Sequence, residues 1–132
     1  MFNYNLLQPA QSFLLSKVVL PFQAPPKSVL LKKPEELSQL EAPLTGKAGQ
    51  DIALQCIVEG GNPLPKMHWF IGGTEIEGSL ESENQEEQTV TSTISILVKK
   101  EDQDKIIRCV VEHEALQVEM EAATELEIQC KQ

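Results

Sequence analysis

The chain has 132 residues, of which 41% are hydrophobic and 23% charged, and its formal net charge is −9. This length suits one domain with tails, and this composition excludes collagen-like, coiled-coil and fully disordered chains. The negative charge repels phosphate groups and anionic lipids, which argues against nucleic acid and against a membrane surface as partners.

The N-terminal part of the chain has no clear pattern. Residues 1–24 contain apolar positions without a period, and the apolar stretch 13–20 lacks the basic flank of a signal peptide. We expect residues 1–24 to be a tail or the remnant of a preceding domain. Pro25 and Pro26 then predict an extended connector, because proline fixes φ and has no N–H to donate. Residues 28–32 are expected to form an edge strand.

Strand patterns become clear in the middle of the chain. Residues 34–43 are expected to form a loop and residues 44–48 a short edge segment. Residues 52–58 then alternate between apolar and polar side chains, which is typical of a half-buried strand. The apolar set comprises Ile52, Leu54, Cys56 and Val58. The Gly60-Gly61-Asn62-Pro63 run is predicted to end this strand in a turn.

The next strands follow the same period of two. Residues 66–71 place Trp69 on one face together with Met67 and Ile71, and a short strand at 74–77 follows a Gly-Gly turn. Residues 81–88 are acidic without an apolar anchor, which indicates a solvated loop with at most a short edge strand. Their spacing matches no calcium-binding loop.

The C-terminal half contains the strongest strand signals. Residues 89–98 are rich in β-branched side chains, and the stretches 107–111 and 118–128 alternate again. The chain therefore has about seven short strands separated by turns, which predicts an all-β fold built as an antiparallel β-sandwich.

The three cysteines permit one internal pair with one thiol left over. Cys56, Trp69 and Cys109 have the spacing of immunoglobulin domains, where a disulfide joins the two sheets and the indole packs against it. Such a disulfide implies an extracellular compartment, whereas two reduced buried thiols would imply a cytosolic domain. Cys130 is the remaining cysteine, which would pair with another domain, with another chain or with nothing.

Two longer stretches carry a family resemblance. GQDIALQCIVEGGNPLPKMHWFIGG and TSTISILVKKEDQDKIIRCVVEHEAL resemble the C2-type (CD80-like) immunoglobulin domain of nectins, nectin-like molecules, nephrin and arthropod beaten-path-type receptors. The resemblance implies an immunoglobulin-like C2-type domain over residues 25–130, joined to a preceding variable-type domain by a hinge at Pro25 and Pro26. Ile107 stands where variable-type domains place a tyrosine, which favours the C2 subtype.

The resemblance also implies a function. The chain is expected to be an extracellular protein-binding domain of a cell-surface adhesion or guidance receptor, with another immunoglobulin-superfamily protein as its homophilic or heterophilic partner. The alternative is a secreted immunoglobulin-domain protein that acts in immunity or ligand binding. No run of 18 apolar residues occurs, so we expect any membrane anchor to lie in segments absent from this chain.

Catalytic signatures are absent from the sequence. It contains no nucleophile elbow, HExxH, CxxC or phosphate-binding glycine loop. We therefore expect no enzyme activity, no cofactor, no metal and no small-molecule substrate.

Alternation predicts one candidate partner-binding face. If Trp69 and Cys109 point inward, their neighbours on the same two strands point outward. We expect an apolar patch with a polar rim, because aromatic and arginine side chains carry much of the energy of protein interfaces. The alternative is that Phe70 is covered by the neighbouring hairpin. The residues of this face are His68, Phe70, Ile106, Arg108 and Val110.

Overall fold

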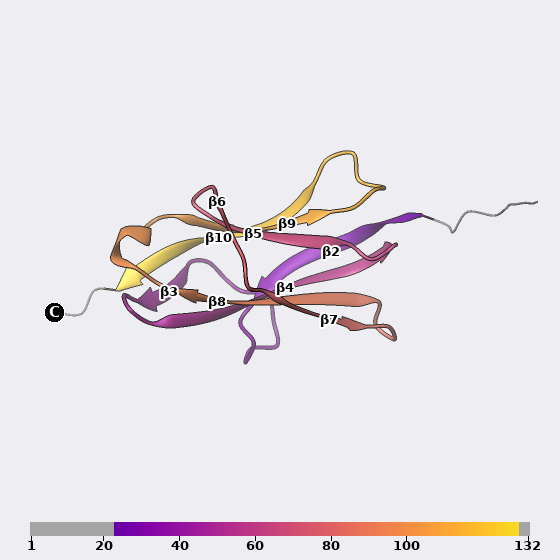
Figure 1. Cartoon of the computed structure of the whole chain (residues 1–132). Helices are drawn as coiled ribbons and strands as arrows, with labels where there is room; N and C mark the ends of the chain where they lie inside the picture. The colour runs from indigo at the N-terminus through magenta and orange to yellow at the C-terminus, as the bar shows by residue number, and fades with distance from the viewer. Residues whose placement is uncertain (1–22, 130–132) are drawn as a thin grey trace, which may run out of the picture.

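Residues 23–129 are described in a computed structural model, and they form two β-sheets packed face to face (Figure 1). The four-stranded sheet contains, in spatial order, β2 (Ala24–Lys32), β4 (Asp51–Asn62), β8 (Thr89–Leu97) and β7 (Leu80–Asn84). The five-stranded sheet contains β3 (Leu44–Lys47), β10 (Met120–Gln129), β9 (Ile106–Glu112), β5 (Lys66–Ile71) and β6 (Thr74–Ile76). A short 3-10 helix, η2 (Lys100–Asp102), precedes β9. The predicted immunoglobulin-like β-sandwich is confirmed.

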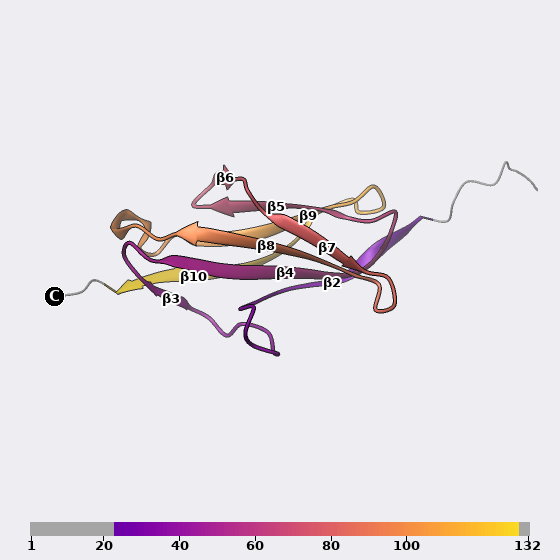
Figure 2. The same ribbon diagram turned by 60° about the horizontal axis from the view of Figure 1, so that its bottom comes forward.

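Neighbouring strands are antiparallel except at one edge, where β3 runs parallel to β10. The chain leaves the four-stranded sheet after β2 and joins the five-stranded sheet at β3. Figure 2 shows the connecting segment, residues 33–43, projecting from the side of the sandwich. Strand β2 begins at the end of the sandwich opposite to the end where β10 finishes (Figure 1).

The predicted disulfide joins the centres of the two sheets. Cys56 on β4 and Cys109 on β9 are bonded, with their Cα atoms 6.4 Å apart and a sequence separation of 53. Both are fully buried, and Trp69 is 1% exposed. The inward faces expected from the period of two are therefore confirmed at the core.

A buried polar chain begins at the indole of Trp69. Its Nε1–H donates to Ser92 Oγ at 2.9 Å, and this hydroxyl donates to Glu81 Oε2 at 2.7 Å. Ser92 is fully buried, whereas Glu81 lies on the exposed strand β7. The Trp69 N–H and the Ser92 hydroxyl, both buried, thus each have a hydrogen-bond partner, as low-polarity interiors require.

His113 joins two loops at the end of the sandwich where β2 begins. Its Nδ1 accepts from the Ala115 N–H at 3.0 Å, so its Nε2 carries the proton and donates to the Pro63 carbonyl at 2.7 Å. His113 is 8% exposed. The loop after β4 is therefore held against the loop after β9.

Several predicted boundaries are wrong. Pro25 and Pro26 belong to strand β2 rather than to a connector, because β2 is an edge strand and tolerates the missing N–H groups. Strand β4 continues through Gly60 and Gly61, whose positive φ angles suit residues without a Cβ. The short edge strand that the sequence allows within residues 81–88 is present as β7, Leu80–Asn84, although all five side chains are exposed.

The domain limits at residues 1–24 and 25–130 remain predictions. Residues 1–22 and Cys130 lie outside the described residues.

Candidate protein-binding face

The five predicted face residues are brought together on the outward side of the five-stranded sheet. His68 pairs with Val110 across β5 and β9, and Phe70 pairs with Arg108 in the same register. Ile106 follows on β9 opposite Glu125 of β10 and is 43% exposed. We call the outward side of β6, β5, β9 and β10 the five-stranded face. Its role in binding remains a prediction.

Val110 does not form part of an open apolar patch. It is 6% exposed, so the prediction that its side chain is presented to a partner is wrong. The cause is its central position in the sheet, between His68 on β5 and Glu121 on β10. Longer neighbouring side chains leave a valine at this position almost no access to solvent.

Phe70 is half-buried, and its ring is covered by Arg108 from the neighbouring strand. The Arg108 guanidinium lies 5.2 Å from the ring centroid, within the range of a cation–π interaction. The same guanidinium donates from Nη1 to Glu121 Oε1 at 3.3 Å. An arginine held by both a ring and a carboxylate presents a partly ordered cation at the surface.

His68 lies between two glutamates and ties three strands together. Its Nδ1 is 3.2 Å from Glu75 Oε2 on β6, and its Nε2 is 2.9 Å from Glu112 Oε1 on β9. The hydrogen bond to Glu112 raises the pKa of His68; burial opposes this effect, and Glu75 adds to it. The same hydrogen bond lowers the pKa of Glu112. Protonated His68 therefore donates to both carboxylates.

Glu75 and Glu121 complete this face, and sequence reasoning missed both. Only the cross-strand register could have identified them, since Glu75 pairs with Phe70 and Glu121 pairs with Val110. The register follows only once the order of strands in the sheet is known. The five-stranded face is consequently a network of charges with two accessible apolar side chains, Phe70 and Ile106, rather than an apolar patch with a polar rim.

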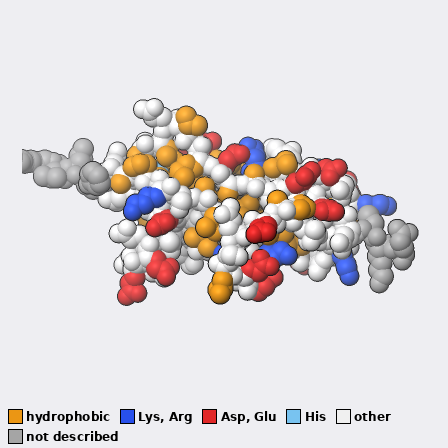
Figure 3. All heavy atoms as spheres, turned by 180° about the vertical axis from the view of Figure 1, so that it is seen from behind, with side chains coloured by type: hydrophobic (Ala, Val, Ile, Leu, Met, Phe, Trp, Pro, Cys, Tyr) orange, Lys and Arg blue, Asp and Glu red, His pale blue; other side chains and the backbone are white. Residues whose placement is uncertain are grey.

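Other kinds of site find little support within residues 23–129. No group of three or more His, Cys, Asp or Glu side chains in this range is arranged to hold a metal ion. No described helix has the length and apolarity needed to cross a membrane. On the side of the molecule in Figure 3, acidic side chains are interspersed with apolar and basic ones.

Comparisons with known proteins agree on one kind of domain. The family model described as a CD80-like C2-set immunoglobulin domain matches residues 33–120. Cell adhesion molecule 1 of Homo sapiens is 34% identical over 88 residues, which cover 66% of this chain and 20% of the human protein. The protein of the same name from Mus musculus is 33% identical over 88 residues, 66% of this chain and 19% of its own length. The chain thus matches about a fifth of each relative.

Two solved structures have the same fold. The full ectodomain (Ig1–Ig3) of mouse nectin-like molecule 4 superposes with a TM-score of 0.64 and 19% identity, covering 92% of this chain and 37% of that one. Rst D1–D2 superposes with a TM-score of 0.64 and 14% identity, covering 91% of this chain and 52% of that one.

Proposed function

The chain belongs to the CD80-like C2-set immunoglobulin domain family, and from this we propose that it is an extracellular adhesion domain that binds another protein. The observation that carries the proposal is the 34% identity to human Cell adhesion molecule 1. The name of this relative describes a protein that takes part in cell adhesion. We propose the same role here, as part of a cell-surface adhesion or guidance receptor.

The disulfide supports the extracellular location. Disulfides persist in secreted and extracellular proteins, whereas glutathione and thioredoxin keep cytosolic thiols reduced. The Cys56–Cys109 bond joins the two sheets at the centre of the core, so the fold suits an oxidising compartment.

The five-stranded face is the proposed contact surface. Aromatic and arginine side chains are enriched in protein interfaces, and this face presents Phe70 under Arg108 together with the exposed Ile106. Carboxylates beside Arg108 and His68 provide both signs of charge within a short distance. Such a mixture favours specific pairing over general adhesion, because a wrong partner leaves charges unpaired.

An immunoglobulin-superfamily protein is the proposed partner, either a second copy or a different member. The placement of the first and last described strands is compatible with a module in a row of domains, since β2 begins and β10 finishes at opposite ends of the sandwich (Figure 1). The name of the mouse nectin-like molecule 4 structure describes such a row, Ig1 to Ig3.

Bead binding tests this function. Beads coated with the oxidised chain are mixed with each other and with living cells, and clustering and cell attachment are counted by microscopy. We expect beads to cluster or to attach to cells, and attachment to be lost when the cells are first treated with trypsin. Attachment that survives trypsin, or the absence of both clustering and attachment, would contradict a protein partner.

A further inference from the structure

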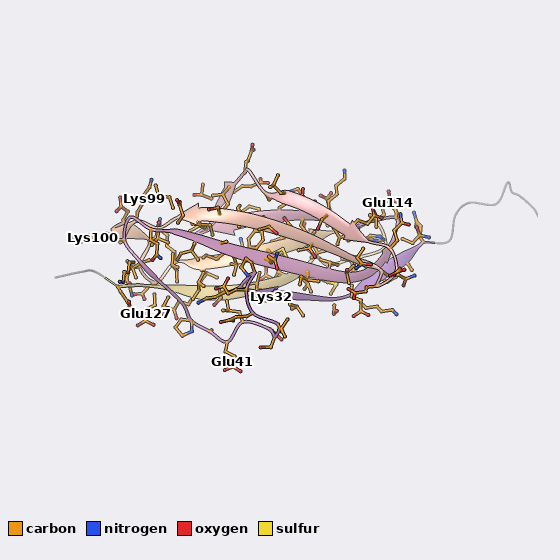
Figure 4. All side chains as sticks on the ribbon, turned by 90° about the horizontal axis from the view of Figure 1, so that it is seen from below. Lys32, Glu41, Lys99, Lys100, Glu114 and Glu127 are labelled. Atoms are coloured by element: carbon orange, nitrogen blue, oxygen red, sulfur yellow. A yellow bond between two sulfur atoms is a disulfide. The ribbon has the colours of Figure 1, made fainter. Side chains whose placement is uncertain are left out.

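Strand β8 is paired along its whole length on one side but only along half of it on the other. Its residues 89–97 pair with β4, whereas β7 pairs with residues 89–93 and ends there. Figure 4 shows β7 beside the half of β8 that is farther from Lys99 and Lys100. We call residues 94–97 the free β8 edge.

The backbone groups of two residues point out of this edge. The Val98 N–H donates to the Gln50 carbonyl, and the Val98 carbonyl accepts from the Gly49 N–H, so Val98 faces the β4 side. Backbone direction alternates along a strand, so Ser95 and Leu97 direct their N–H and C=O groups to the other side. No described residue pairs with them there.

The other sheet edges carry features that discourage strand pairing. Strand β2 contains Pro25 and Pro26, and β7 carries Glu81 and Glu83 in the phase that faces the core. Strands β3 and β6 have four and three residues. Prolines, charges and short edges are the common devices against edge pairing. The free β8 edge is as short as β3, but it reads Ile-Ser-Ile-Leu and contains neither proline nor a charged residue.

An apolar cleft adjoins the free β8 edge. Its apolar part is lined from the edge itself by Ile94 and Ile96, and from the opposite sheet by Ile71 and Ile76. Its polar part includes Glu77, Lys99, Asp102 and Lys105. A strand added to the edge would direct alternate side chains into this cleft. Lys99 is exposed and forms no ion pair with a described residue.

We propose that the free β8 edge binds an extended segment of a partner protein as an added strand. The segment has aliphatic or β-branched side chains at alternate positions, which enter the cleft, and a carboxylate beside Lys99. Main-chain hydrogen bonds to Ser95 and Leu97 supply the affinity that is independent of side chains, as in other strand additions. The carboxylate of the segment pairs with Lys99, because the other lysine at the cleft, Lys105, already forms an ion pair with Asp102.

A second copy of this chain fits the edge less well. Strand β7 projects one strand width, about 4.8 Å, beyond the free β8 edge. Two β8 edges brought together would therefore meet the projecting β7 strands before they could pair. A single extended segment avoids this obstacle when it ends opposite Ile94, because β7 begins opposite Thr93. The site lies on the four-stranded sheet, so it is separate from the five-stranded face and does not depend on it.

Amide NMR with a synthetic peptide tests the proposal. The probe is acetyl-Thr-Val-Thr-Val-Asp-Asp, added to the oxidised chain at low salt. We expect the amide signals of Ser95 and Leu97 to shift and their exchange with solvent to slow, with a Kd on the order of 1 mM. The same peptide with an N-methyl group on its central residues loses its backbone donors and should bind at least about tenfold more weakly.

Substitutions identify the edge. Ser95→Lys combined with Leu97→Lys places charge on the free edge and should weaken binding at least about tenfold, whereas Ser82→Lys on β7 should leave it unchanged. Lys99→Glu should weaken it about threefold or more, and less so at high salt. The NMR spectrum of each variant shows whether the variant is folded. The methylated peptide is tested against the wild-type chain, so its result does not depend on the folding of any variant.

Three outcomes would overturn the proposal. These are the absence of shifts at Ser95 and Leu97, equal binding of the methylated peptide, and shifts at these amides that grow with protein concentration without peptide. The last result would assign the edge to self-association.

Discussion

The hydrogen bond between Trp69 and Ser92 offers a direct test of the core. Ser92→Ala removes the acceptor of the Trp69 Nε1–H, which lies 2.9 Å from Ser92 Oγ. Both side chains are buried, so no water replaces the lost oxygen. A buried donor left without a partner costs about 1–3 kcal/mol, and we expect the free energy of unfolding to fall by this amount.

A double-mutant cycle separates this effect from the loss of packing. Trp69→Phe deletes the N–H and also leaves a cavity, but in that background Ser92→Ala leaves no donor unpaired. The coupling between the two substitutions should be about 1 kcal/mol or more. Urea unfolding, followed by far-UV circular dichroism so that every variant has the same probe, measures all four proteins. Equal costs of Ser92→Ala in both backgrounds would refute the reasoning.

Three further predictions concern pH, the disulfide and the loops. His68→Gln should remove part of the pH dependence of stability. The pKa of His68 is higher in the folded chain than the unfolded value of 6.5, so protonation of His68 stabilises the native chain fully below pH 6.5. This stabilisation is lost as the pH rises through the folded-state pKa. Replacing Cys56 and Cys109 by alanine should cost about 4 kcal/mol, from the 53-residue separation. His113→Ala leaves a carbonyl and an N–H unpaired and should cost about 1–3 kcal/mol.

Urea midpoints check each of these expectations. For His68, the difference in urea midpoint between the wild type and His68→Gln is compared at pH 5.5 and pH 8. A difference that does not shrink at the higher pH would contradict the stabilisation of protonated His68 by Glu75 and Glu112. For the cysteines, a loss below about 1 kcal/mol would contradict the stabilising role of the cross-link. For His113, an unchanged midpoint would show that the two loops are held by other contacts.

The period of two was sufficient to predict the core. Cys56, Trp69 and Cys109 each occupy the apolar phase of a strand, and a half-buried strand leaves this signal in local sequence. The order of the strands and their register are not local properties. Val110 was predicted to be exposed because alternation gives only a direction, whereas its burial depends on His68 and Glu121 from two other strands.

Strands at the edges of the sheets were the hardest to predict. Strand β7 is exposed on both sides, so it has no alternating pattern and resembles a loop in sequence. Pro25 and Pro26 indicate a connector unless the chain is known to lie at an edge, where the missing N–H groups would face solvent. The free β8 edge also has no local sequence signal. It can be recognised only once the length of β7 and its pairing with β8 are known.

Attachment of beads coated with face variants tests the proposed adhesion role most directly. Arg108→Gln with Ile106→Asp changes two accessible positions of the five-stranded face, and Leu80→Asp with Ser82→Glu makes the same change of net charge at two exposed positions of β7 on the four-stranded sheet. Both variants should keep the disulfide and the fold, because surface changes usually cost little stability. We predict that the first variant loses attachment at least about tenfold while the second retains it. Equal attachment by both variants would contradict binding through the five-stranded face.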